Sequence, residues 1–293
     1  MKEKKHRRLL RGETAEKLVM TLPVSLIMYL LVAIPFIYII IISFMHKGTY
    51  GGVTPGFTFG NYLGILNPLY LKTFGKSLLM SAIVTMICLL IAYPFSWAVA
   101  GKGKIARKVI MSMVMVPFCM SMVIRLFSWI ILLRSDGVLN RFLMSLHLID
   151  TPFKLVYNSV GAYIGLVYML LPFMIMPLYS SMEKLDRSLL EAASDLGSNP
   201  VQAFLEVTLP LTKPGIFAGS IMVFIPSLGL YFITDMMGGS KALVIGNLVK
   251  NQFITARNWP LGAAMSVVLM LITLLMVRIY TKTGGSLNDL NGL

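Results

Sequence analysis

The chain has 293 residues, of which 57% are apolar and only 13% are charged. Soluble domains carry about 25% charged residues, so this composition excludes a soluble domain and also an intrinsically disordered chain. The formal net charge of +14 would suggest nucleic-acid binding in a soluble protein. Here the basic residues lie between long apolar segments and indicate membrane orientation instead, so we expect a lipid bilayer and no nucleic acid as partner.

The chain begins with a basic segment, residues 1–17, which holds seven Lys or Arg residues. The apolar run that follows is too long for the hydrophobic region of a cleaved signal peptide, and no A-x-A cleavage site comes after it. We therefore expect residues 1–17 to form a cytoplasmic tail ahead of a first membrane span.

Six apolar runs are long enough to cross a hydrocarbon core, which takes about 20 helical residues. Helices are expected because an open sheet edge leaves backbone groups unpaired in lipid. The expected spans are residues 18–44, 78–100, 109–133, 159–182, 214–234 and 262–280. The sequence thus predicts an all-α membrane domain over residues 18–280 with a short C-terminal tail at 281–293, and prolines inside five of the spans predict kinks.

Basic residues also predict the orientation of these spans. The N-terminal tail, the 101–108 loop, the 183–213 loop and the C-terminal end hold 16 Lys or Arg residues, against nine in the alternate loops. Under the positive-inside rule both termini are cytoplasmic. Arg125 is the remaining basic residue and falls inside the third span.

Two pairs of glycines have the G-x-x-x-G spacing that lets helix backbones approach closely. They are Gly161 with Gly165 and Gly215 with Gly219. The spacing fits packing within the chain and also fits a subunit interface.

The sequence contains none of the catalytic motifs that we sought. We find no metal-ligand or nucleophile motif, and Gly75, Lys76 and Ser77 resemble the end of a phosphate-binding loop only by coincidence, because Tyr70 stands where its first glycine belongs. We therefore expect no enzyme, no catalytic residue, no metal and no cofactor bound by this chain. Uphill transport would take its energy from an ion gradient or from another polypeptide.

The 183–213 loop predicts two short capped helices. Ser188 and Glu191 have the spacing of a capping box, and Gly197 fits a left-handed helix stop. Asn199 with Gln202 predicts a second cap, and we expect Pro210 to end the second helix. Apolar side chains in this loop indicate a surface that meets another protein.

One pattern in the loop resembles the EAA signature of permease subunits of bacterial ABC importers. It runs EAA, three residues, Gly, nine residues, then Val-x-Leu-Pro, with Val in place of the usual Ile. Its residues are Glu191, Ala192, Ala193, Gly197, Val207, Leu209 and Pro210. By resemblance, this segment is the coupling helix that docks into a separate ATPase.

Longer segments resemble the permeases of bacterial spermidine/putrescine importers, the PotB type. They are NPLYLKTFGKSLL, LPFMIMPLYSSMEKLDRSLLEAASDLG, ITDMMGGSKALVIGN and RNWPLGAA. The resemblance implies a type I importer permease in the bacterial inner membrane that forms a heterodimer with a second related permease. It also implies two copies of a cytoplasmic ATPase, which uses ATP and Mg, and an extracytoplasmic polyamine-binding protein.

A polycation calls for carboxylates and aromatic faces along its path. Asp235, at the outer end of the fifth span, is either a substrate contact or a solvated helix end, and Tyr231 and Ser227 precede it at four-residue steps on one helical face. Tyr231, Tyr168, Trp97 and Trp129 are aromatic candidates, although an interfacial belt or core packing explains each of them more readily.

We expect Arg125 to have a partner or to reach the outer interface, because a charge at membrane depth costs about 2.5–3.5 kcal/mol. Trp129, one turn outward, can cover the Arg125 guanidinium, and Asp235 is a possible salt-bridge partner if spans three and five are neighbours. Alternative functions that stay open are an ABC permease for another small solute, an ion-driven carrier and a membrane enzyme.

Overall fold

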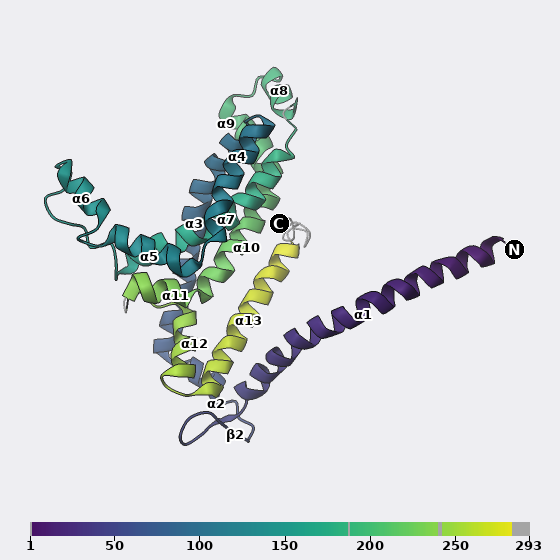
Figure 1. Cartoon of the computed structure of the whole chain (residues 1–293), viewed down its shortest axis with the longest axis vertical. Helices are drawn as coiled ribbons and strands as arrows, with labels where there is room; N and C mark the ends of the chain where they lie inside the picture. The colour runs from purple at the N-terminus through teal and green to yellow at the C-terminus, as the bar shows by residue number, and fades with distance from the viewer. Residues whose placement is uncertain (1, 187, 240–241, 283–293) are drawn as a thin grey trace.

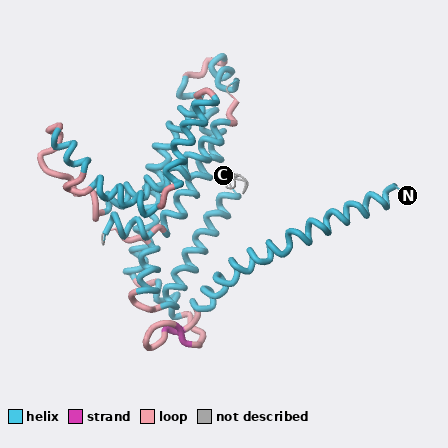
Figure 2. The backbone as a smooth tube through the Cα atoms, in the orientation of Figure 1, coloured by secondary structure: helices cyan, strands magenta, loops and turns pink. Residues whose placement is uncertain are grey.

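The structure is a computed structural model that describes the backbone of residues 2–186, 188–239 and 242–282, and their side chains except those of residues 2–20 and 280. Most of the expected C-terminal tail, residues 283–293, lies outside the described residues. The chain is almost entirely helical (Figures 1 and 2). The membrane-length helices are α1 (Lys2–Ser43), α3 (Pro68–Ala100), α7 (Ser159–Glu183), α10 (Leu209–Gly229) and α13 (Trp259–Lys282).

Shorter elements connect these helices. The short helices are α2 (Gly60–Ile65), α4 (Lys104–Met115), α5 (Met122–Leu133), α6 (Val138–Ser145), α8 (Ser188–Asp195), α9 (Pro200–Ala203), α11 (Tyr231–Ile233) and α12 (Ile245–Ile254). One 3₁₀ turn, η1 (Val116–Cys119), and two π-helical turns, η2 (Phe204–Thr208) and η3 (Thr234–Gly238), join neighbouring helices. Strands β1 (His46–Lys47) and β2 (Val53–Thr54) pair antiparallel, with His46 opposite Thr54.

Helix α1 contains both the expected basic tail and the first span. It is helical without a break at residue 17, and it projects away from the other helices until its C-terminal end reaches α13 (Figure 1). The apolar side chains of its residues 21–43 are largely exposed in the isolated chain, which suits a helix whose surroundings are lipid or another membrane subunit.

The third expected span is broken. Within the described residues, five helices are long and apolar enough to cross a membrane, and a sixth span exists only if the bent pair Lys104–Cys119 and Met122–Ser145 counts as one, with 97° between its parts. Pro117 lacks an amide hydrogen and Met120 has extended backbone, so the helix cannot continue through η1. The prediction of one kinked helix over 109–133 is therefore wrong in its geometry.

The fifth expected span also ends early. The α10 helix stops at Gly229, and Leu230 has a ψ of 59°, outside the helical range, before the chain resumes in α11. The expected single helix over 214–234 is therefore wrong at its outer end, and Ser227 does not share a continuous helix with Tyr231 and Asp235.

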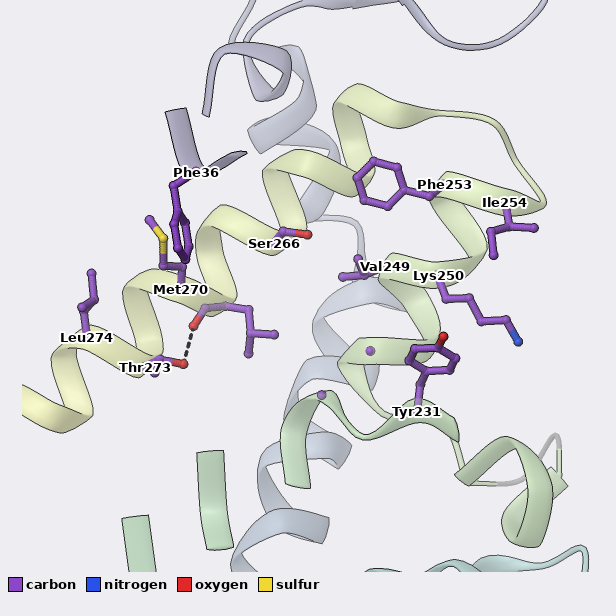
Figure 3. Close-up of a pocket in the computed structure, with 13 residues that line it drawn as sticks. Phe36, Tyr231, Val249, Lys250, Phe253, Ile254, Ser266, Met270, Thr273 and Leu274 are labelled. Atoms are coloured by element: carbon purple, nitrogen blue, oxygen red, sulfur yellow. Dashed lines mark hydrogen bonds between the residues drawn. The ribbon is translucent and has the colours of Figure 1, made fainter. Parts of the chain in front are cut away.

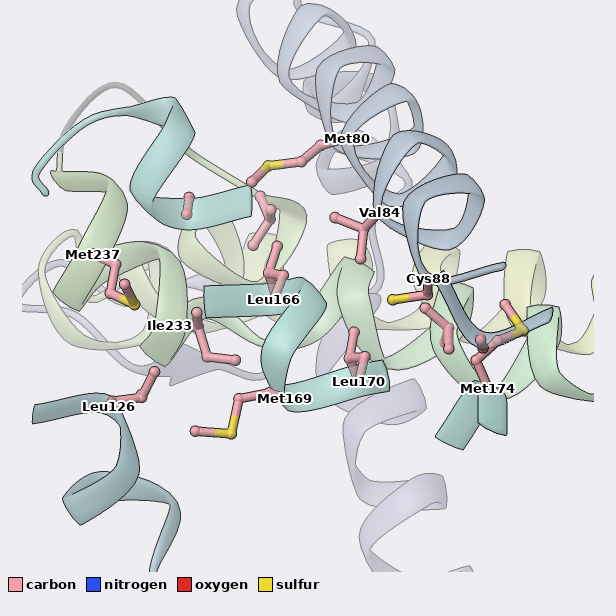
Figure 4. Close-up of a cluster of buried hydrophobic side chains, with 14 of the residues drawn as sticks. Met80, Val84, Cys88, Leu126, Leu166, Met169, Leu170, Met174, Ile233 and Met237 are labelled. Carbon is pink, nitrogen blue, oxygen red and sulfur yellow. The ribbon is translucent and has the colours of Figure 1, made fainter. Parts of the chain in front are cut away.

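Helix α7 lies between α3 and α10 and forms the centre of the bundle. Its buried side chains Leu166, Leu170 and Met174 pack with Val84 and Cys88 of α3 (Figure 4). A second buried cluster attaches α12 and α13 to the bundle. Its members are Ile65, Phe74, Leu228, Ile245, Leu261, Ala264 and Met265.

Glycines allow α7 and α10 to approach this closely. A Cβ atom on Gly215 would lie 2.4 Å from Ser181 Oγ and 2.7 Å from the Pro177 carbonyl oxygen, and one on Gly219 would lie 2.7 Å from Met174 Sδ. A Cβ on Gly161 would meet the Met237 carbonyl oxygen at 2.7 Å. The G-x-x-x-G spacings therefore serve packing within the chain.

We expect Gly215→Ala to lower the thermal stability of the purified chain in detergent, because the added methyl group meets a backbone carbonyl that cannot move aside. Overpacking of this kind costs about 1–3 kcal/mol. Gly75→Ala is the control, because a Cβ on Gly75 has no neighbour within 4 Å. Equal melting temperatures for the two variants would contradict close packing of α7 and α10.

Candidate functional site

The 183–213 loop forms a compact cap at one end of the bundle, where Figure 1 shows α8 and α9. Ser188, which was expected to cap α8, is instead its first residue, and its amide donates a hydrogen bond to Asp186 Oδ1 at 3.0 Å. Hydrogen bonds from Ser188 hold the pKa of Asp186 below its ordinary value. The predicted capping box is therefore wrong in placing Ser188 at the N-cap, because Ser188 is already inside α8.

Gly197 ends α8 in the expected left-handed conformation, with a φ of +84°. The Ser198 amide donates to the Ala193 carbonyl at 3.0 Å, and the Gly197 amide donates to the Ser194 carbonyl at 2.9 Å. These two bonds form a Schellman motif, which satisfies the last carbonyls of α8. A side chain on Gly197 would meet no atom within 4 Å, so only the backbone conformation requires glycine here.

The second cap is confirmed in full. Asn199 Oδ1 accepts from the Gln202 amide at 2.9 Å, and Gln202 Oε1 accepts from the Asn199 amide at 3.0 Å. Pro210 does not end this helix as expected, because the chain runs from Pro200 to Gly229 as one membrane-length helix. The π-helical turn Phe204–Thr208 lies just before Pro210. Its wider backbone accommodates the proline, which has no amide hydrogen and cannot donate a helical hydrogen bond.

The EAA residues form an exposed surface on this cap. Glu191 and Ala192 are exposed, Ala193, Val207 and Leu209 are half-buried, and Pro210 is exposed. Leu196 is 87% exposed at the tip of α8, which is unusual for leucine. The platform is anchored from below, because Tyr93 of α3 packs edge-on to Phe204 and lies 3.0 Å from the Thr212 hydroxyl.

A cavity of about 720 Å³ lies beneath the platform, between the α3–α4 turn and the α7–α8 turn. Trp97 and Lys102 line it from one side and Glu191 from the other. Arg107 Nη1 and Glu183 Oε1, which also line the cavity, form a salt bridge of 3.0 Å. The basic 101–108 loop and the EAA loop therefore lie at the same end of the molecule, and Trp97 belongs to this end.

The second candidate region is the junction after α10, where Asp235 lies on η3. The Asp235 carboxylate accepts hydrogen bonds from Asn247 Nδ2 and from the Lys250 ammonium, both on α12. The same ammonium lies 5.3 Å from the centre of the Tyr231 ring. The carboxylate raises the pKa of Lys250 above its ordinary value, so the lysine stays charged throughout the physiological range.

Asp235 therefore does not pair with Arg125, and that alternative is wrong. The Arg125 guanidinium lies 4.4 Å from the centre of the Phe118 ring, beyond the break in the third span. Trp129 does not cover it as expected but packs on Tyr168, with ring centres 5.1 Å apart. Arg125 Nε and Nη1 are buried and have no hydrogen-bond partner among the residues that the structure describes.

Of the six residues expected along a substrate path, Asp235 and Tyr231 meet at the Lys250 ammonium, and Trp129 and Tyr168 form a separate pair. Ser227 is fully buried and donates to the Phe224 carbonyl of its own helix. Trp129 and Tyr168 pack against the main core. No group of three or more His, Cys, Asp or Glu side chains in the described part of the chain is placed to hold a metal ion.

Sequence reasoning missed Lys250 and Asn247. Both are 12 to 15 residues beyond Asp235 and on a separate helix, so no helical or strand periodicity relates them to the carboxylate. A weak signal existed in the composition, because Asn247 stands in the apolar segment ALVIGNLV, where a buried amide needs a polar partner.

Comparison with known proteins identifies related sequences. Residues 92–283 match the family described as "Binding-protein-dependent transport system inner membrane component". The spermidine/putrescine transport system permease protein PotB of Escherichia coli strain K12 is 44% identical over 259 residues, which cover 88% of this chain and 94% of that protein. The protein of the same name from Haemophilus influenzae is 40% identical over 257 residues, covering 88% and 90%.

Solved structures of low sequence identity share the fold. A chain of the bacterial alginate ABC transporter, in complex with an alginate pentasaccharide-bound periplasmic protein, aligns with a TM-score of 0.73 at 15% identity and covers 93% of this chain and 96% of its own. A chain of the inward-facing MetNI methionine ABC transporter aligns with a TM-score of 0.53 at 17% identity, covering 73% and 93%. The architecture is thus that of ABC importer membrane subunits.

We expect Asp235→Asn to lower the melting temperature of the purified chain, because the Lys250 ammonium loses its anionic partner. Both side chains are about a third exposed, 33% for Asp235 and 34% for Lys250. The loss should therefore be about 1–2 kcal/mol, less than in a fully buried pair.

Adding Lys250→Met to the same chain should recover part of that loss in a double-mutant cycle. Arg125→Met should not, because Arg125 lies on Phe118 and not on Asp235. Recovery by Arg125→Met alone would contradict the pairing described above.

Proposed function

The chain belongs to the binding-protein-dependent transport system inner membrane component family, and we propose that it is the membrane subunit of an ATP-driven importer of the polyamines spermidine and putrescine. The observation that carries this proposal is the 44% identity to a spermidine/putrescine permease over 88% of the chain. The EAA platform supports it independently, because a rigid exposed surface at one end of the bundle is what coupling to a second protein requires.

The platform of α8 and α9 is the proposed contact with the ATPase. Helix α8 ends in a Schellman motif and α9 begins with a capping box, so hydrogen bonds within the chain fix the turn between the two helices. Glu191, Ala192 and Leu196 are exposed for contact. ATP and Mg would be used by two copies of that ATPase, and this chain itself would bind no cofactor and hydrolyse nothing.

The remaining partners follow from the same proposal. A second related permease would complete a heterodimer in the bacterial inner membrane, and an extracytoplasmic binding protein would deliver the polyamine. The EAA end of the bundle and both termini would face the cytoplasm, as the distribution of basic residues indicates. The exposed apolar side chains of α1 would face lipid or the second permease.

The proposed substrate contact is the junction of Asp235 and Tyr231. A carboxylate beside an aromatic face suits an alkylammonium group, which gains both charge pairing and a cation–π contact. The Lys250 ammonium already makes both contacts at this position. The junction is therefore chemically competent to hold an organic cation.

The function is tested by reconstituting the chain with its neighbouring permease, ATPase and binding protein in liposomes and measuring ATP-driven uptake of labelled spermidine and putrescine. We expect uptake to require ATP and the binding protein, and we expect no ATP hydrolysis by the chain alone. Uptake of a different small solute instead would reassign the substrate. Uptake driven by an ion gradient without ATP would reject the importer.

We expect Gly197→Val to insert normally but to reduce uptake and solute-stimulated ATP hydrolysis together. A β-branched residue forced to the left-handed φ of +84° is strained by about 1–2 kcal/mol, which would tilt α8 rather than unfold the bundle. Gly197→Asn is the matched control, because asparagine tolerates this conformation. Normal coupling in the valine variant, or equal defects in both variants, would contradict a role for the α8 geometry in coupling.

A further inference from the structure

Lys250 places an alkylammonium group in the candidate cation site. Its side chain is a four-carbon chain that ends in an ammonium, which is the same chemical group that ends a polyamine. The ammonium pairs with the Asp235 carboxylate and lies 5.3 Å from the centre of the Tyr231 ring. The site therefore already holds a cation that belongs to the protein.

The carboxylate does not depend on Lys250 for its position. Asn247, which is 1% exposed, donates to Asp235 Oδ1 through its amide nitrogen. The amide oxygen of Asn247 accepts from the Thr234 hydroxyl at 2.9 Å and from the Val244 amide at 2.8 Å. Because Asn247 is fixed by both sides of the junction, Asp235 keeps its orientation when the lysine leaves.

Lys250 has both solvent access and room to move. Its side chain is 34% exposed, and it lines the rim of a cavity of about 660 Å³ together with Tyr231. Figure 3 shows Lys250 and Tyr231 on one side of this cavity, with Ser266, Met270 and Leu274 of α13 on the other. A displaced lysine can lay its carbon chain along the apolar wall, which includes Val249 and Ile254, and keep its ammonium at the rim.

We propose that Lys250 is a tethered stand-in for the substrate, which occupies the Asp235 and Tyr231 site at rest and is displaced by an ammonium group of the incoming polyamine. The inference rests on the proposed function, since it takes a polyamine as the cargo. It goes beyond that function by assigning Lys250 the role of an internal competitor. A resident ammonium also keeps the carboxylate neutralised between transport cycles and so disfavours occupation by inorganic cations.

An internal competitor weakens substrate binding by a measurable factor. When a site is free for only a fraction of the time, the apparent dissociation constant rises by the inverse of that fraction. If the lysine occupies the carboxylate about nine-tenths of the time, removing it should strengthen binding about tenfold. A purely structural ion pair predicts no gain in affinity when the lysine is removed.

The experiment measures binding of labelled spermidine to the assembled transporter, purified without its binding protein. We expect Lys250→Met to bind spermidine about tenfold more tightly than the unaltered transporter. Lys250→Arg should bind spermidine no more tightly than the unaltered transporter, because the arginine keeps a cation at this position. The double variant Asp235→Asn, Lys250→Met should lose the gain. Lys72→Met, which removes an exposed lysine from α3, is the matched control and should leave binding unchanged.

Unchanged or weaker binding in Lys250→Met, with the transporter fully assembled, would overturn the inference. Should that variant fail to assemble, Lys250→Gln removes the charge but retains a hydrogen bond to Asp235, and the same gain is expected of it. ATP-driven spermidine uptake by the unaltered transporter separates the two claims. Uptake without a gain in affinity rejects only the stand-in, whereas absence of both uptake and binding rejects the polyamine function together with it.

Discussion

A membrane interior supplies no water to backbone amides and carbonyls, and this single constraint decides where the chain is regular and where it is not. Helices α3, α7 and α13 form the bundle and pair most of their backbone internally, although Pro94 in α3 and Pro172 and Pro177 in α7 each remove one helical hydrogen bond. Two departures from regularity have a local remedy. The widened turn at Phe204–Thr208 accommodates Pro210, and the side chain of Asn247 approaches the Tyr231 carbonyl at 3.5 Å after the break at Leu230.

The break at Leu230 also creates the polar junction. In an uninterrupted helix the backbone carbonyls would all accept helical hydrogen bonds, and Asp235 would lie on the same helical face as Ser227. Because the helix stops, η3 packs against α7 and forms side-chain hydrogen bonds with α12, and buried polar groups from both sides of the junction meet around Asn247. Such networks are favourable only when each member is satisfied, and here the carboxylate, the amide and the ammonium satisfy one another.

Features set by neighbours in sequence could be predicted, and features set by distant residues could not. The left-handed Gly197, the Asn199 cap and the four unbroken apolar spans depend on a few adjacent residues, and the sequence predicted them correctly. The partners of Asp235 and Arg125 depend on two helix breaks that turn the following residues in new directions. From the sequence, Pro117 predicted a kink where the structure has a complete break, and the end of α10 at Gly229 was not predicted. The EAA pattern identified the family through residue types and spacing, without these tertiary details.

The helix from Pro200 to Gly229 links the exposed platform to the polar junction without an intervening loop. Thirty residues at 1.5 Å each make a rod of about 45 Å. If such a rod pivots at one end, a tilt of about 10° sweeps the other end through about 8 Å, roughly the length of an extended lysine side chain. A tilt of this size about the platform would therefore move the end of the helix at Gly229, next to the break that precedes Asp235, by more than the length of a hydrogen bond.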